Sequence, residues 1–179
     1  QQIEIMSKYK LNIFHFHITE DIAWRLAVKQ YPQLTAEDNM LRNRGRYYSE
    51  ADMNELISFC KERYITFIPE IDMPGHSAAF ERAMGVDMQS DSGLVICKNI
   101  LTELCRELDV PYVHVGGDEV KITYKEFLPQ MISLLKSLEK KVIAWQPGGN
   151  TPEGTILQMW IGDTKPKDNY YSVDSRHLY

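Results

Sequence analysis

The sequence predicts an α/β protein built on a parallel β-sheet, because apolar segments of strand length alternate with amphipathic helical segments. Polar clusters follow five of the strand-like segments, and they read HITED, DMPGH, GGDE, WQP and WIGD. The carboxyl ends of all strands meet on one face of a parallel barrel, whereas a doubly wound sheet gathers only a few of them. The five clusters therefore favour a (β/α)8 barrel, of which about six strands are recognisable.

The elements follow one another without an internal repeat beyond the βα unit. Strands are predicted at 11–18, 65–71, 112–115, 141–145, 155–160 and 170–175. Helices are predicted at 3–9, 49–64, 77–84, 99–108 and 124–140. Ser49 with Asp52 three residues later predicts a capping box, and Thr123 is a candidate cap for the last helix. The long polar stretch 19–48 is unusual inside a compact domain unless it is functional.

Composition and charge exclude several classes of protein. The 179 residues are 44% hydrophobic and 25% charged with a net charge of −5, which excludes intrinsic disorder. No apolar run approaches the roughly 20 residues of a membrane-spanning helix. The acidic balance, without a block of Lys or Arg, argues against nucleic acid and anionic membranes as partners. The three cysteines form no CxxC pair and are expected to be small buried hydrophobic residues.

The segment HVGGDEV, residues 114–120, is the strongest sign of chemistry. Its two glycines let the backbone bend where a strand stops, so that Asp118 and Glu119 can reach one pocket. Neighbouring carboxylates push each other's proton affinities apart, which suits one group to act as an acid while the other stays ionised. The alternative is an ordinary helix start, where acidic residues favour the positive N-terminus.

This segment resembles the H-x-G-G-D-E signature of glycoside hydrolase family 20, the β-N-acetylhexosaminidases. FHFHITEDIAWRL at 14–26 is similar to another segment of that family, and IPEIDMPGHSAA at 68–79 is close to its usual form. AWQP and LQMW match two later tryptophan positions. The resemblance implies that residues 1–179 form part of one catalytic (β/α)8 domain, with the first and last of its eight strands missing. The resemblance also implies that catalysis in this domain requires no cofactor and no metal.

The resemblance also implies a retaining, substrate-assisted mechanism, an exception to the scheme with a protein nucleophile. Glu119 matches the family's general acid and base, and Asp118 matches the residue that orients the substrate's 2-acetamido group. The acetamido oxygen attacks the anomeric carbon and forms an oxazolinium intermediate. Trp145 and Trp160 match the aromatic walls of the sugar pocket, and Tyr179 matches a tyrosine that holds the acetamido oxygen.

A relay to the acid is implied in the same way. His76 matches a family histidine that pairs with an acidic residue following the first of the predicted strands. The family usually has an aspartate there, and this chain has Glu20 followed by Asp21, so that both residues are candidates. Arg25 is expected to make a structural ion pair.

The implied partner is a glycan with a terminal N-acetylhexosamine, and the family suggests a secreted, periplasmic or lysosomal location. The chain is shorter than the roughly 250 residues of a closed barrel, so we expect an incomplete domain whose open sheet edges favour self-association. We also expect this length alone to be inactive or very poor as a catalyst.

Two alternatives remain at this point. His15 and His17 alternate along one strand and share a face, as the ligands of a metal-dependent amidohydrolase do. A simpler interpretation of these histidines is packing in the barrel core. The second alternative is a truncated, inactive barrel that only binds glycans.

Overall fold

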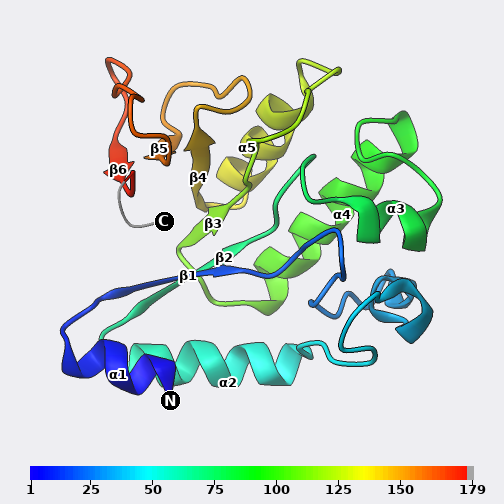
Figure 1. Ribbon diagram of the computed structural model, residues 1–179, viewed down its shortest axis with the longest axis horizontal. Helices are drawn as coiled ribbons and strands as arrows, with labels where there is room; N and C mark the ends of the chain where they lie inside the picture. Colours follow the sequence, from blue (N-terminus) through cyan, green and yellow to red (C-terminus); the bar gives the residue numbers. More distant parts are fainter. Residues whose placement is uncertain (177–179) are drawn as a thin grey trace.

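A computed structural model describes residues 1–176 and contains one six-stranded parallel sheet in the order β1-β2-β3-β4-β5-β6 (Figure 1). The strands are β1 (Ile13–His17), β2 (Thr66–Glu70), β3 (Tyr112–His114), β4 (Lys141–Gln146), β5 (Ile156–Met159) and β6 (Ser172–Asp174). All five strand pairs are parallel, with registers such as Phe14 opposite Phe67 and Trp145 opposite Gln158. The predicted α/β fold and its six strands are therefore confirmed.

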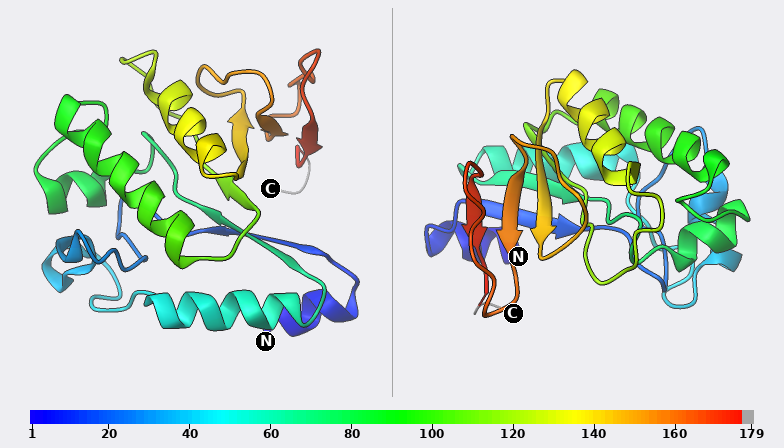
Figure 2. Two further views of the ribbon diagram at one scale, coloured as in Figure 1. Left: turned by 180° about the vertical axis from the view of Figure 1, so that it is seen from behind. Right: turned by 90° about the horizontal axis from the view of Figure 1, so that it is seen from above.

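The sheet curves into an open arc with its helices on the outer side (Figure 2). The helices are α1 (Gln2–Lys8), α2 (Glu50–Lys61), α3 (Ala78–Met84), α4 (Asp91–Glu107) and α5 (Phe127–Ser137). Helices α4 and α5 pack against each other, while α2 lies against β2 and α5 against β4. Because β1 and β6 each have a single neighbour within the described chain, the arc has two open edges.

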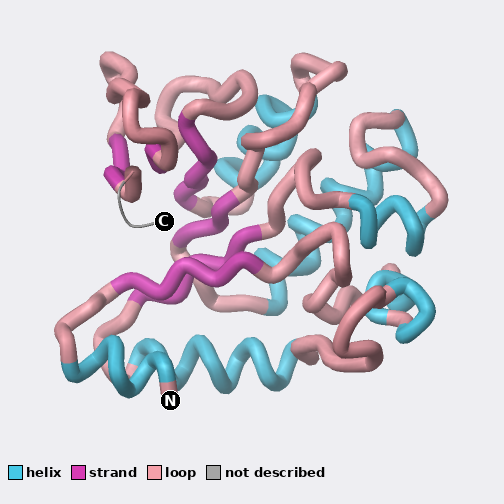
Figure 3. Tube along the Cα trace, in the orientation of Figure 1, coloured by secondary structure: helices cyan, strands magenta, loops and turns pink. Residues whose placement is uncertain are grey.

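Local sequence accounts for the starts of α2 and α4, which have side-chain caps. The predicted capping box is present: the Ser49 hydroxyl accepts from the Asp52 amide, and the Asp52 carboxylate accepts from the Ser49 amide. Between β1 and α2, the chain holds only two 3-10 turns, η1 (Pro32–Thr35) and η2 (Glu37–Asn39), and is otherwise loop (Figure 3).

The starts of two helices differ from the prediction by three residues or more, and α2 and α5 each end three residues earlier than expected. Helix α4 begins eight residues earlier than expected, because the Ser90 hydroxyl accepts from the Gly93 amide and caps it. Helix α5 begins at Phe127, and Thr123 does not cap it but bonds Gln89. Proline has no N–H and its ring opposes a preceding helical turn, so Pro129 is accommodated only in the first turn.

The main hydrophobic core fills the space between the sheet and the outer helices. Phe67, Val113 and Val142 face Leu101 and Leu135 within one buried cluster. Cys60 and Cys97 are buried without a disulfide, as expected, and Cys105 is half-buried. Among the described residues, no helix has the length and apolar character needed to cross a bilayer.

Candidate active site

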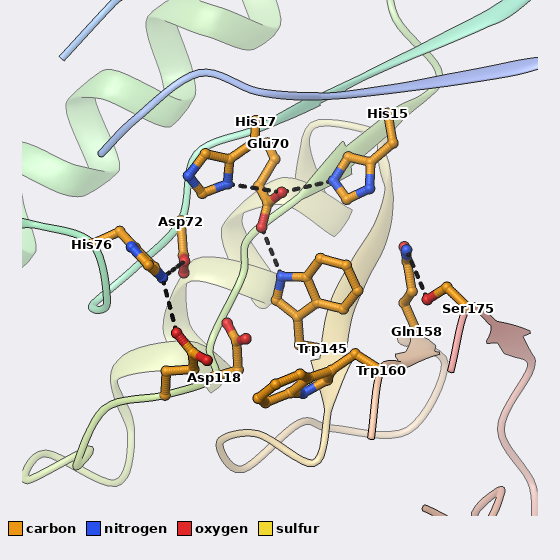
Figure 4. A pocket seen from close by; sticks show the side chains of 11 residues that line it. His15, His17, Glu70, Asp72, His76, Asp118, Trp145, Gln158, Trp160 and Ser175 are labelled. Atoms are coloured by element: carbon orange, nitrogen blue, oxygen red, sulfur yellow. Dashed lines mark hydrogen bonds and ion pairs between the residues drawn. The ribbon is translucent and has the colours of Figure 1, made fainter. Parts of the chain in front are cut away.

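A pocket of about 460 Å³ opens at the carboxyl ends of the strands (Figure 4). Its walls come from every part of the described sheet, which is why residues far apart in the sequence meet there. The residues that line it are His15, His17, Glu70, Asp72, His76, Asp118, Glu119, Trp145, Gln158, Trp160 and Ser175.

The loop after β3 places Asp118 and Glu119 in this pocket, and no helix starts at them. Gly116 and Gly117 have positive φ angles of 66° and 95°, which glycine adopts without strain. A Cβ atom on Gly116 would lie 1.7 Å from Asp72 Oδ1, so only glycine fits there. The Gly117 amide donates to the same oxygen at 3.1 Å. The close approach of this loop to Asp72 therefore explains Gly116, whereas at Gly117 a Cβ atom would lie 2.8 Å from the Leu128 side chain.

Glu119 and His76 contact each other at the pocket rim. Both have left-handed backbone conformations, with φ angles of 53° and 45°, which are uncommon outside glycine and are often found at functional sites. His76 Nε2 lies 3.4 Å from Glu119 Oε2, and His76 Nδ1 lies 2.5 Å from Glu20 Oε1. Asp21 instead accepts from the Ala78 amide at 3.0 Å, at the start of α3. Of the two candidates, Glu20 makes the contact expected for a relay.

The carboxyl groups differ sharply in their proton affinity. Burial, together with the charge of Glu70, raises the pKa of Asp72 to about 7. Burial also raises the pKa of Asp118, and the charges of Glu70 and Glu119 add to this effect. Burial opposes the charged form of His76, but Asp72 and Glu20 raise its pKa above the ordinary value. The pocket thus holds groups that exchange protons near neutral pH.

Glu70 is a functional candidate that the sequence analysis did not identify. Its side chain is 1% exposed, and one of its oxygens, Oε2, lies 2.7 Å from His15 Nε2 and 3.1 Å from His17 Nδ1. Burial alone raises a carboxyl pKa, but contacts from three imidazoles outweigh it and hold the pKa of Glu70 well below its usual range. His15 and His17 thus line the pocket beside an anion instead of packing in the apolar core.

Trp145 and Trp160 both line the pocket, as the resemblance implies. The Trp145 indole N–H donates to Glu70 Oε1 at 2.8 Å, and the Trp160 indole N–H donates to the Pro147 carbonyl at 3.0 Å. Each ring is therefore held in one orientation. Tyr179 lies outside the described residues, so its proposed role remains a prediction.

Two polar residues of the pocket were absent from the sequence prediction. The Gln158 amide donates to the Ser175 hydroxyl at 3.3 Å, opposite the acidic loop. In β5, the half-buried Ile156 and Gln158 alternate with the buried Leu157 and Met159, so Gln158 lies on the face opposite these two residues. The residue types of this segment gave no signal for Gln158. Arg25 corrects another expectation: its guanidinium donates to the carbonyl oxygens of Arg42, Asn43 and Arg46, and not to a carboxylate.

Three groups within the described residues have donor atoms close enough for a metal ion. They are His15, Glu70 and His114; His17, Glu70 and Asp72; and Glu20, Asp21 and His76. In the first group, His114 Nδ1 already accepts the Gly116 amide at 3.0 Å, so its lone pair is used. This hydrogen bond argues against the first group as a metal centre of the amidohydrolase kind.

Comparison with known families decides the assignment. The family model described as "Glycosyl hydrolase family 20, catalytic domain" matches residues 1–92, just over half of the chain. The chain belongs to glycosyl hydrolase family 20. This membership confirms the resemblance seen in the sequence and leaves the amidohydrolase alternative without support.

Relatives in the family cover most of this chain. The beta-hexosaminidase of Porphyromonas gingivalis is 29% identical over 91% of the chain, and the beta-N-acetylhexosaminidase of Cellulomonas fimi is 30% identical over 92%. The chain spans only 28% and 39% of the lengths of these two relatives.

Solved structures of this family share the fold. The beta-N-acetylhexosaminidase of Bacteroides fragilis has a TM-score of 0.78 at 30% identity, covering 89% of this chain and 40% of that one. The N-acetyl-beta-hexosaminidase of Streptomyces plicatus has a TM-score of 0.80 at 26% identity, covering 93% and 39%. The six-stranded arc is thus part of a (β/α)8 barrel, as predicted.

Proposed function

We propose that the protein is a retaining glycoside hydrolase that removes terminal β-linked N-acetylhexosamine from the non-reducing end of glycans. The single observation that carries this proposal is the placement of Asp118 and Glu119 side by side in one aromatic-walled pocket, in different surroundings. The family's relatives support the substrate class, because a Streptomyces plicatus family member was solved with the product GlcNAc.

Glu119 is the proposed general acid and base. Its side chain is 52% exposed at the rim and contacts His76, so that it can reach the glycosidic oxygen of a bound sugar. In the first step it gives its proton to the leaving alcohol. In the second step it takes a proton from the water that opens the intermediate, which restores the acid.

Asp118 is the proposed partner of the acetamido group. It is buried below the rim, beside the tryptophans, where a carboxylate can accept the acetamido N–H and stabilise positive charge (Figure 4). The acetamido oxygen then forms a bond to the anomeric carbon while the glycosidic bond breaks, which gives an oxazolinium. Water opens that ring from the same face that the leaving group occupied, so that the anomeric configuration is retained.

Two substitutions in the intact protein test these roles. Glu119→Gln is expected to lower kcat/KM for an aryl N-acetyl-β-glucosaminide by about 100-fold or more, because proton transfer is lost. Asp118→Asn is expected to cause a loss of similar size through weaker acetamido participation. Glu62→Gln, which changes an exposed carboxylate outside the pocket, serves as the control. Unchanged kcat/KM in either pocket variant would contradict its assigned role.

The aromatic walls of the pocket, Trp145 and Trp160, also suit one alternative, a barrel that binds glycans without hydrolysing them. A thiazoline that mimics the oxazolinium separates the two functions. A hydrolase binds this mimic more tightly than the parent sugar, whereas a glycan-binding protein has no reason to prefer it.

A further inference from the structure

The Glu70 carboxylate lies at the centre of the pocket floor and contacts side chains from three other strands. Oε2 lies near His15 and His17 of β1, and Oε1 accepts the indole N–H of Trp145 from β4. Oε1 also lies 3.3 Å from Nδ1 of His114 on β3. A buried carboxylate is costly unless its lone pairs are satisfied. Here the nitrogens of His15 and His17 beside Oε2 and the Trp145 indole N–H beside Oε1 satisfy them. His114 Nδ1 instead accepts the Gly116 amide and does not donate.

The hydrogen bond from Trp145 to Glu70 restricts the position of the indole ring. A buried indole N–H needs an acceptor, and Glu70 Oε1 supplies it at 2.8 Å. The ring also packs against His114 and His15, with centroid separations of 4.8 and 5.6 Å. The Glu70 carboxylate thus fixes the indole in two ways. It accepts the indole N–H directly, and it contacts the two imidazoles that pack against the ring.

We propose that Glu70 is a positioning residue that determines specificity for the N-acyl group by holding the Trp145 indole against it. This inference rests on the proposed function, in which Trp145 walls the acetamido site. Glu70 does not touch the sugar and acts through the ring. A fixed wall leaves room for an acetyl group and excludes longer acyl chains, whereas a ring free to tilt admits them.

The size of the expected effect follows from the chemistry of apolar pockets. One additional methylene in a rigid apolar pocket changes kcat/KM by about 10- to 200-fold. The wild-type protein should therefore prefer an aryl 2-acetamido glucoside over its 2-propanoylamino and 2-butanoylamino analogues by at least that factor. A Trp145 ring that no longer donates to Glu70 should lose most of this preference for the acetamido substrate.

Three variants of the intact protein test the inference by the ratio of kcat/KM between the acetamido and butanoylamino substrates. Glu70→Leu removes the acceptor and should reduce the ratio at least tenfold. Glu70→Gln keeps one carbonyl oxygen for the indole and should retain most of the ratio. Trp145→Phe keeps a ring without an N–H and should reduce the ratio, and adding Glu70→Leu to it should reduce the ratio no further.

Thr155→Val is the matched control, because it removes a buried hydroxyl that bonds the Pro152 carbonyl and lies outside the pocket lining. It should lower thermal stability while leaving the ratio unchanged. A wild-type ratio in folded Glu70→Leu, or in Trp145→Phe if Glu70→Leu does not fold, would overturn the inference. Absence of any hydrolysis by the wild-type protein would instead overturn the proposed function.

Discussion

At the scale of single residues, four carboxyl groups of the same pocket have been given different properties by their surroundings. Glu70 stays ionised because imidazoles and an indole donate to it or face it. Asp72 lies two residues further along the chain. Burial and the charge of Glu70 raise its pKa to about 7, although His76 Nε2 lies 3.8 Å from its carboxylate. Burial also raises the pKa of Asp118, and Glu119 lies at the exposed rim. Environment, not residue type, thus separates their roles.

The raised pKa of Asp72 predicts a pH-dependent contribution to stability. The unfolded chain ionises this group near pH 3.8, whereas the folded protein keeps its proton until about pH 7. The unfolded state therefore binds fewer protons in this window, and the contribution of Asp72 to the free energy of unfolding falls as pH rises.

Asp72→Asn should remove that dependence. Between pH 4 and pH 8, the wild type should lose roughly 1–3 kcal/mol of unfolding free energy relative to the variant. Denaturant titrations of both proteins across this range measure the difference. A difference that stays constant with pH would contradict the assigned pKa.

Substitutions of the adjacent residues Glu20 and Asp21 are expected to have opposite effects on kcat/KM and on stability. Glu20→Gln removes the anion beside His76 and should lower kcat/KM by about 10- to 100-fold with little loss of stability. Asp21→Ala removes the acceptor at the start of α3 and should cost about 1 kcal/mol of stability, with kcat/KM nearly unchanged. Steady-state kinetics and thermal denaturation of both variants check this. The reverse pattern would show that Asp21 is the relay residue.

The sequence could predict some of these residues and not others. Asp118, Glu119 and His76 lie in contiguous motifs, so a single stretch of chain reveals them. Glu70 escaped prediction because its partners come from β1, β3 and β4, and only folding brings them together. The choice between Glu20 and Asp21 depends on side-chain direction after a strand, which a pattern of residue types does not contain.

At the scale of elements, strands were predicted more accurately than helix ends. Apolar runs between polar clusters located all six strands to within two or three residues. The start of α4 was missed because Ser90 lies in a polar stretch, before the apolar spacing becomes regular. Thr123 resembled a cap in sequence, but the ring of Pro129 moved the start of α5 to Phe127.

The turn after β3 is the element on which the acidic pair depends. Gly116→Ala should destabilise the fold by more than about 2 kcal/mol, because its Cβ would collide with Asp72 and the backbone has a φ of 66°. Gly85→Ala is the matched control: its φ is 71°, but no atom lies within 4 Å of the added Cβ. It should cost only about 1 kcal/mol. Equal losses in urea denaturation would contradict the packing argument.

At the scale of the whole molecule, the described sheet is an arc with unpaired edges at β1 and β6. The family's relatives are longer than this chain, and the two described above exceed it more than twofold. Unpaired parallel edges with exposed apolar residues, such as Ile13 on β1, are templates for pairing with another chain. The chain is shorter than a closed barrel, which predicted open edges, and the strand order places them at β1 and β6.

The 179-residue chain by itself should therefore self-associate as its concentration rises. Ile13→Lys places a charge on the β1 edge and should shift the association to higher concentration. Tyr64→Lys adds the same charge at a side chain that is 91% exposed and away from that edge, and should have little effect. Sedimentation velocity compares the three proteins. A monomer at all concentrations, or equal effects of both lysines, would contradict this expectation.

The central claim is that the acetamido group of the substrate, held by Asp118, acts as the nucleophile. The most direct measurement is kcat/KM of the intact protein for aryl glucosaminides whose acetamido methyl carries zero to three fluorine atoms. Fluorine withdraws electrons from the carbonyl oxygen and weakens it as a nucleophile. We predict a stepwise fall of at least about 100-fold across the series, equivalent to about 2.7 kcal/mol in the barrier. Rates that do not change with fluorination would contradict substrate assistance.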